Sequence, residues 1–96
     1  MTDAPAMTDA PATAEELNAF VHRRLCAMES LLEDQFVTAA TPLVRRGRAC
    51  GTQYLLKGPR SVRLGAVWAA DRNELFVYDA EGRRTEKIAL PRRIAS

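Results

Sequence analysis

Apolar and polar residues follow two different periods along the chain, and the change occurs near Pro42. Before Pro42, apolar side chains recur every three to four residues, which predicts an amphipathic α-helix over residues 13 to about 32. The segment Thr13-Ala14-Glu15-Glu16 is typical of a helix start, because the threonine accepts a backbone amide while the last glutamate reaches back. The apolar stripe of this helix consists of Leu17, Phe20, Val21, Leu25, Met28 and Leu32.

After Pro42, apolar residues alternate with polar ones, and turns that contain glycine or asparagine separate the alternating runs. This pattern predicts antiparallel strands joined by short turns. Together with the helix, it predicts an α+β fold in which an N-terminal amphipathic helix packs on a four- to five-stranded antiparallel β-meander. The expected strands span residues 43–46, 49–56, 61–69, 74–79 and 84–90.

The turn between the third and fourth expected strands ends at Asn73, a residue type that tolerates a positive φ. A three-residue turn followed by a bulge then places Ala70 opposite Glu74. With that register Trp68 faces Phe76, and the largest apolar side chains share the face that the helix covers. These side chains are Val62, Leu64, Trp68, Phe76, Tyr78 and Ile88.

The opposite face of the expected sheet combines an apolar centre with basic edges. One helix cannot cover both faces, so we expect this surface to bind a protein partner or a second copy of the chain. A change of one residue in the turn would exchange the two faces. The candidate interface residues are Val67, Leu75 and Val77.

Charge is distributed unequally along the chain. The net charge is +2, yet residues 1–41 hold two basic and seven acidic side chains, whereas residues 42–96 hold twelve basic and five acidic ones. A basic surface attracts phosphate groups, which makes nucleic-acid binding the alternative function. The acidic helix can equally pack on the basic half and cancel its field. The candidate anion-binding residues are Arg45, Arg46, Arg48, Arg60, Arg83 and Arg84.

Four aromatic residues lie on the expected strands, namely Tyr54, Trp68, Phe76 and Tyr78. An exposed ring on a sheet can stack on the bases of a single-stranded nucleic acid. A cross-strand pair of large rings is more often part of a core, so we expect Trp68 and Phe76 to pack under the helix.

The length of 96 residues allows one small core, so the sequence predicts a single domain over residues 13–90. Its repeated MTDAPA segment is too poor in large apolar residues to order itself, so residues 1–12 are predicted to be disordered, and residues 91–96 form a basic tail. No apolar run approaches the roughly 20 residues of a membrane span, and no signal-peptide core is evident. We therefore expect no membrane association and a cytoplasmic location.

Motifs for catalysis or metal binding are sparse. His22 is the only histidine, and it shares the polar helix face with Cys26, Glu29 and Glu33. A closed zinc site normally needs four ligands, and nothing in the sequence orients His22 as a base for the Cys26 thiol. The chain also lacks the phosphate loop GxxxxGKS/T. We therefore expect a non-enzymatic interaction module without a metal site or a cofactor.

A distinctive set of turn and core residues lies between Arg46 and Lys87, a stretch that covers about two fifths of the chain. These residues are Cys50-Gly51, Gly58-Pro59-Arg60-Ser61-Val62, Trp68, Asn73, Tyr78-Asp79, Gly82 and Arg84. With its glycine-proline-arginine turn, tryptophan strand and tyrosine-aspartate turn, this stretch resembles a group of short uncharacterised bacterial proteins. The resemblance implies a shared fold, and no activity or site residue follows from it.

Overall fold

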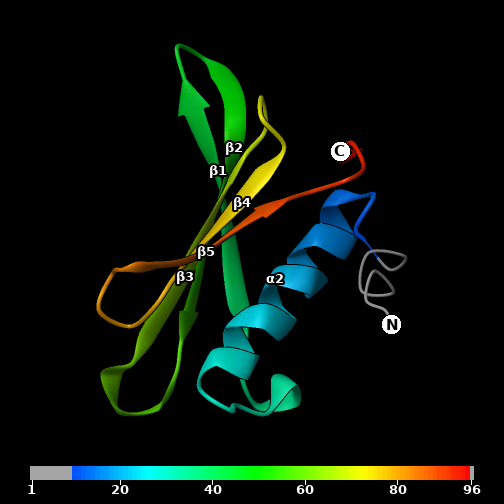
Figure 1. The fold of residues 1–96 in the computed structure, drawn as a ribbon. Helices are drawn as coiled ribbons and strands as arrows, with labels where there is room; N and C mark the ends of the chain where they lie inside the picture. The colour runs from blue at the N-terminus through cyan, green and yellow to red at the C-terminus, as the bar shows by residue number, and fades with distance from the viewer. Residues whose placement is uncertain (1–9, 96) are drawn as a thin grey trace.

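The computed structural model describes residues 10–95, in which one α-helix precedes five strands. The strands pair in chain order as an antiparallel meander, and the helix lies against one side of the sheet (Figure 1). The predicted α+β fold, with an N-terminal helix on an antiparallel sheet, is therefore confirmed. The elements are α2 (Ala14–Met28), η1 (Glu33–Gln35), β1 (Thr38–Arg45), β2 (Arg48–Lys57), η2 (Pro59–Ser61), β3 (Arg63–Ala69), β4 (Glu74–Tyr78) and β5 (Arg84–Ala89).

The start of α2 has the predicted reciprocal cap. The Glu16 amide donates to Thr13 Oγ1 at 3.1 Å, and Glu16 Oε1 accepts from the Ala12 amide at 2.8 Å. The first bond satisfies one of the amide groups that a helix start leaves unpaired, and the second holds the residue before the cap against the first turn. Residues 1–9 of the predicted disordered segment lie outside the described residues, whereas Ala10 is 5% exposed and buried.

The end of α2 comes earlier than predicted. The helix stops at Met28, and Ser30 has a φ of 55°, which is incompatible with continuing a right-handed helix. The chain then turns back, and the Leu31 amide donates to the Cys26 carbonyl at 2.8 Å. As a result Leu31 packs against the core, and Leu32, which the periodicity placed in the apolar stripe, is 66% exposed.

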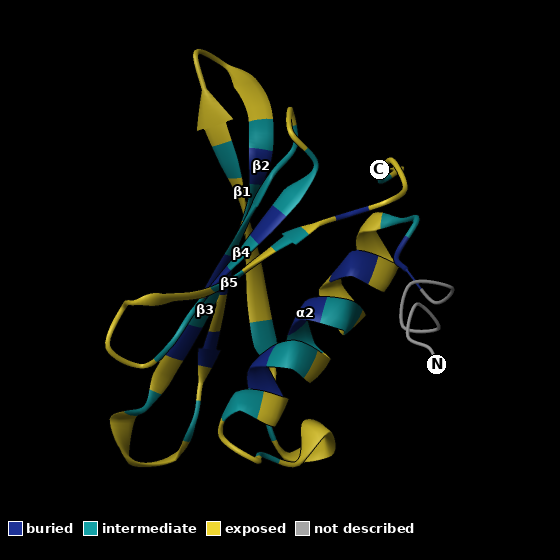
Figure 2. Ribbon diagram, in the orientation of Figure 1, coloured by how far each residue is buried: buried dark blue, intermediate teal, exposed yellow. Residues whose placement is uncertain are grey.

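The hydrophobic core lies between α2 and the sheet. Figure 2 shows buried residues on the side of α2 that faces the strands and exposed residues on its other side. Burying one large apolar side chain, such as a leucine or a valine, contributes about 1.5–3 kcal/mol to the stability of the fold. The helix supplies Leu17, Val21, Leu25 and Cys26, and the strands supply Tyr54, Leu56, Leu64, Ala66, Leu75 and Val77.

The register between β3 and β4 differs by one residue from the predicted register. Trp68 pairs with Leu75, whereas the sequence predicted that Trp68 faces Phe76. Because side chains alternate between the faces of a strand, this shift exchanges the two sides of β4. Leu75 and Val77 lie under α2 and are 0% exposed, whereas Phe76 and Tyr78 lie on the other face.

The shift accompanies a longer turn than the predicted one. The amide of Ala70 donates to the carbonyl of Cys50 on β2 at 3.0 Å, and the carbonyl of Ala70 accepts from the Asn73 amide at 3.3 Å. Ala70 is therefore the first residue of a four-residue turn that ends at Asn73, where φ is 53°. Ala69 therefore pairs with Glu74, in place of Ala70.

Asn73 also anchors the C-terminal segment. Its Oδ1 accepts from Trp68 Nε1 at 3.0 Å, and its Nδ2 donates to the carbonyls of Arg92 at 2.6 Å and Leu90 at 3.3 Å. The segment beyond β5 is thereby directed back toward the start of α2. There the Ala95 amide donates to the Ala12 carbonyl at 2.8 Å and forms part of a parallel bridge.

The edge strand β1 begins five residues before the predicted start at Leu43, and it includes Pro42. Proline is tolerated there because an edge strand has one side that pairs with no neighbour. The other strand boundaries lie within two residues of the predicted ones. No helix within residues 10–95 combines the length and the apolar composition that a membrane crossing requires.

Candidate functional site

The six arginines predicted to bind anions do not form a single rim. Consecutive strands of an antiparallel meander run in opposite directions, so alternate turns lie at opposite ends of the sheet. The turns before β2 and β4 therefore share one end, and those before β3 and β5 share the other. Arg45, Arg46 and Arg48 lie at the first end, Arg60 and Arg83 lie at the second, and Arg84 begins β5.

The face of the sheet that α2 leaves uncovered carries two aromatic rings and four cations. We call it the open face. Val67, Phe76 and Tyr78 are only partly buried here and do not belong to the core cluster. Strand pairing places on the open face Gln53, Leu55, Lys57, Arg63, Gly65, Val67, Glu74, Phe76, Tyr78, Arg84 and Lys87.

Gly65 forms the floor of a hollow in the open face. It pairs with Leu55 on β2 and with Tyr78 on β4, and its missing side chain leaves a space of about 380 Å³ between them. Arg63, Gln53 and the acidic residue Asp79 also line this space. The volume falls within the range of about 300–1,000 Å³ that is common for small-molecule sites. The Gly65 hollow is therefore large enough for one planar ring.

The cations give the open face a positive charge. The Arg84 guanidinium lies 5.4 Å from the centroid of the Phe76 ring, a distance at which cation–π attraction holds it over the ring. Lys87 Nζ lies 3.6 Å from Glu74 Oε2, the carboxylate of the open face. The other two cations of the open face form no ion pair with any residue from 10 to 95. Four cations thus lie around the aromatic rings of the open face, and Glu74 and Asp79 are the acidic residues near them.

The predicted interface residues are only partly on this surface. Val67 is on the open face, but Leu75 and Val77 are fully buried beneath α2, so the prediction that they form an exposed interface is wrong. The predicted register also concealed the Gly65 hollow, because it placed Tyr78 under the helix. A glycine within a strand-like run is the signal that indicates such a site.

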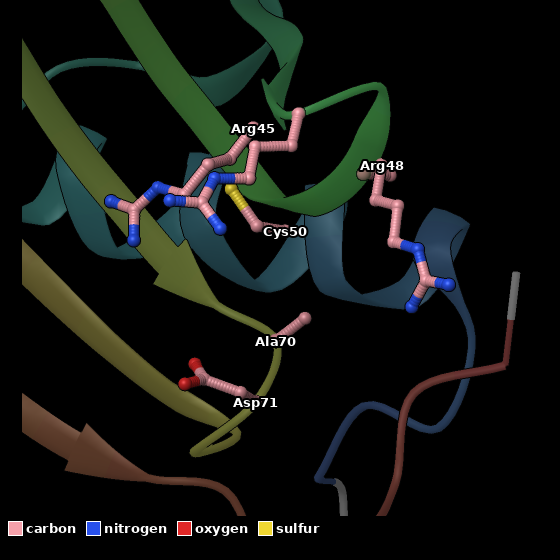
Figure 3. A pocket seen from close by; sticks show the side chains of 7 residues that line it. Arg45, Arg48, Cys50, Ala70 and Asp71 are labelled. Carbon is pink, nitrogen blue, oxygen red and sulfur yellow. The ribbon is translucent and has the colours of Figure 1, made fainter.

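A second and larger hollow, of about 800 Å³, lies at the end of the sheet formed by the β1–β2 hairpin. We call it the hairpin hollow. Arg45, Arg46 and Arg48 line it, and Asp71 of the β3–β4 turn lies across from them. In Figure 3 the side chain of Arg45 and the sulfur of Cys50 extend in the same direction, whereas Arg48 extends away from Arg45. None of the three arginines forms an ion pair with a residue of the described chain.

Three local features position the hairpin hollow. Arg46 and Gly47 have φ values of 53° and 78°, so the hairpin closes with a two-residue turn in which both residues are left-handed. Cys50 is the extra residue of a β-bulge in β2, which redirects the strand. A Cβ atom at Gly51 would lie 2.0 Å from the Trp68 carbonyl oxygen, so only glycine permits this approach of β2 to β3.

His22 and Cys26 lie together on α2, and the contacts of His22 engage both nitrogens of its ring. His22 Nδ1 lies 2.7 Å from Thr38 Oγ1, and Nε2 lies 2.8 Å from the Glu33 carbonyl oxygen, so both ring nitrogens are engaged. Cys26 was predicted on the polar helix face but is 1% exposed, because η1 packs against α2. Burial, and then the charge of Glu33, raise the pKa of the Cys26 thiol, which favours the unreactive neutral form. Residues 10–95 contain no cluster of three potential metal ligands.

Comparison of the chain with protein-family models, with curated proteins and with solved structures found no match. The resemblance to short bacterial proteins therefore stays a prediction. Function is inferred below from the geometry of the open face and of the hairpin hollow.

Proposed function

We propose that the protein is a non-enzymatic module that binds single-stranded nucleic acid on the open face. One base enters the Gly65 hollow and stacks against the ring of Tyr78, while the neighbouring cations pair with phosphates. The observation that carries this proposal is that Tyr78, Gly65 and Arg63 line one space of about 380 Å³.

Stacking favours a single strand over a duplex. The bases of a duplex already stack on one another, whereas those of a single strand can turn out onto a protein ring. Stacking on an aromatic side chain contributes about 1–3 kcal/mol per base and tolerates any sequence. Tyr78 is partly exposed on β4 next to Gly65 of β3, so the access that such stacking needs is open.

The cations of the open face suit the sugar-phosphate backbone. Arg84 is held over Phe76, so its guanidinium is already oriented on the surface when a phosphate arrives. Each neutralised phosphate of a single strand adds about −0.7 to the slope of log affinity against log salt concentration. If all four cations bind phosphates, the slope is about −3.

The same charges weigh against symmetric pairing of two copies through the open face. Such pairing would bring four cations of one copy against four of the other, with Glu74 and Asp79 of each copy as the acidic residues between them. Like charges placed opposite each other destabilise an interface. Self-association, and the binding of an acidic protein, are therefore treated as alternative outcomes of the experiment.

The test measures fluorescence anisotropy of short labelled RNA and DNA strands of mixed sequence at increasing salt. The decisive variant is Gly65→Val, which fills the hollow from its floor. A Cβ at Gly65 lies 3.4 Å from the Tyr54 carbonyl oxygen, an ordinary contact, and valine favours strands. Ala89→Val, on the exposed end of β5, adds similar apolar bulk outside the hollow and serves as the control.

We expect Gly65→Val to lower the affinity at least about tenfold, the equivalent of losing one stacked base, with an unchanged free energy of unfolding. Ala89→Val should bind as the parent does. Affinity that is unaffected by Gly65→Val or by salt contradicts the proposal. A dimer in light scattering that dissociates on Gly65→Val would instead assign the open face to self-association. Retention of an acidic protein without nucleic-acid binding would assign it to a protein partner.

A further inference from the structure

The hairpin hollow lies on the β1–β2 hairpin, at the end of the sheet opposite Arg60 and Arg83. We propose that it is a phosphate-binding site in its own right. Its ligand carries a terminal phosphate group, which Arg45 and Arg46 bind. This site shares no lining residue with the Gly65 hollow, so it does not depend on the proposed function.

Charge is the first reason for this assignment. Three arginines at four consecutive positions line one space, and Asp71 is the only carboxylate among the lining residues. Arg48 extends away from Arg45, which leaves the adjacent Arg45 and Arg46 as the candidate pair for one ligand. The ion pairs within residues 10–95 involve none of these arginines, so a ligand would supply their counter-charge. A terminal phosphate supplies close to two negative charges and three acceptor oxygens, which match the planar fork of arginine.

Backbone geometry is the second reason. Left-handed positions favour glycine or asparagine, yet the tip of this hairpin holds Arg46 at a φ of 53°. The bulge at Cys50 and the close approach at Gly51 fix the hairpin beside Asp71 and Ala70. The guanidinium groups therefore start from a constrained turn, which reduces the conformational entropy that binding must remove.

Size decides the class of ligand. About 800 Å³ exceeds the volume of a single phosphate group, so the space accommodates the molecule that carries the phosphate as well. Pyrophosphate, a nucleotide and the phosphorylated end of a nucleic-acid strand share this chemistry. The experiment separates these sources.

Cys50 provides a reporter inside the site. It lines the hairpin hollow and is partly exposed, whereas Cys26 is 1% exposed and therefore protected from reagents. Iodoacetamide alkylates a thiolate, with formation of a carbon–sulfur bond and loss of iodide. We expect pyrophosphate to slow this alkylation in a saturable manner at constant ionic strength, measured by intact mass and located by peptide mapping.

The variant Arg45→Gln with Arg46→Gln removes two adjacent cations from the hollow. The variant Arg60→Gln with Arg83→Gln removes the same charge from the opposite end of the sheet. Loss of a charge-assisted hydrogen bond weakens binding about tenfold, so the first variant should need at least about tenfold more pyrophosphate for the same slowing. The second variant should behave as the parent does, and circular dichroism confirms that both fold.

An oligonucleotide with and without a 5′-phosphate distinguishes a nucleic-acid end from a small phosphorylated molecule as the source of the phosphate. Greater slowing by the phosphorylated strand assigns the site to a nucleic-acid end, and slowing by pyrophosphate alone assigns it to a small phosphorylated molecule. Alkylation that is insensitive to all three reagents overturns the proposal, as does an equal effect of the two double variants. Gly65→Val leaves the slowing by pyrophosphate unchanged, so this proposal and the proposed function can fail separately.

Discussion

The two faces of the sheet come from the same alternating strands but have different roles. Beneath α2, Leu56, Leu64 and Leu75 are 0% exposed. On the open face, the larger rings of Phe76 and Tyr78 remain partly exposed among cations. The aliphatic residues are therefore inside, and the rings of β4 are outside. Strand register, and not the size of the side chain, decided which face became the core.

The largest expected effect comes from truncating one residue on each side of β4. Leu75→Ala removes a fully buried side chain and should lower the free energy of unfolding by about 2–5 kcal/mol. Tyr78→Ala on the open face should cost about 1 kcal/mol or less, as a partly exposed position away from the core does. Urea denaturation measures both values. Equal costs at the two positions would contradict the assignment of the faces.

A smaller loss of stability is expected at Asn73, which ends the turn between β3 and β4. Asn73→Ala removes the acceptor of Trp68 Nε1 and the donor to two carbonyls, and it places alanine at a φ of 53°. We expect a loss of about 1–3 kcal/mol in thermal or urea unfolding. Asn73→Gly restores the backbone freedom and should lose less, since only the hydrogen bonds are then missing. If both variants match the parent, the anchor has no role in stability.

Alkaline pH should lower the stability of the core between α2 and the sheet. Burial raises the pKa of the Cys26 thiol, and the charge of Glu33 raises it further. Burial also raises the pKa of the Tyr54 phenol, although a hydrogen bond with Thr52 opposes this shift. The unfolded chain therefore releases these protons at a lower pH than the folded chain does. Stability is complete below the ordinary thiol pKa of about 8.5 and falls as the pH rises through the folded pKa values.

The measurement is urea unfolding between neutral pH and about pH 10, with reductant present. The variant Tyr54→Phe lacks one of the two groups, so its stability should decline less with pH than that of the parent. An identical decline in both proteins would exclude Tyr54 as a cause.

The smallest expected effect on stability comes from an ion pair between α2 and β5, at the edge of the core. Arg24 of α2 and Glu86 of β5 form an ion pair, with side chains 42% and 40% exposed, and Arg24 also lies 5.8 Å from the Phe20 ring centroid. Solvent screens such a pair, so a double-mutant cycle with Arg24→Gln and Glu86→Gln should give a coupling of about 0.5 kcal/mol. A coupling of several kcal/mol would mean that α2 is fastened to the sheet electrostatically and not by its apolar face.

Local patterns in the sequence were sufficient to predict the helix and the strands. The cap at Thr13 and Glu16 and the alternation after Pro42 depend on neighbouring residues, so they could be predicted without the fold. The end of α2 was harder, because Leu31 and Leu32 are chemically alike and only the turn at Ser30 decides which of them packs.

The candidate sites depend on contacts between distant segments. The Gly65 hollow depends on the register between β3 and β4, which differs by one residue from the register that the turn residues predict. The hairpin hollow requires Asp71 to lie beside Arg45 across two turns. No local period carries this information, so the arginines were identified from composition but their division between the two ends of the sheet was not.

The bridge between residues 13 and 95 has a further consequence for connectivity. Ala14 donates to Ala95, and Ala95 donates to Ala12, so the beginning of the helix and the segment after β5 are neighbours. The path of the chain is therefore nearly a closed loop. A circular permutant that links Ala95 to Ala12 and opens at the β4–β5 turn would keep each strand beside its present neighbours, and its synthesis would begin at the edge strand β5 and end at β4.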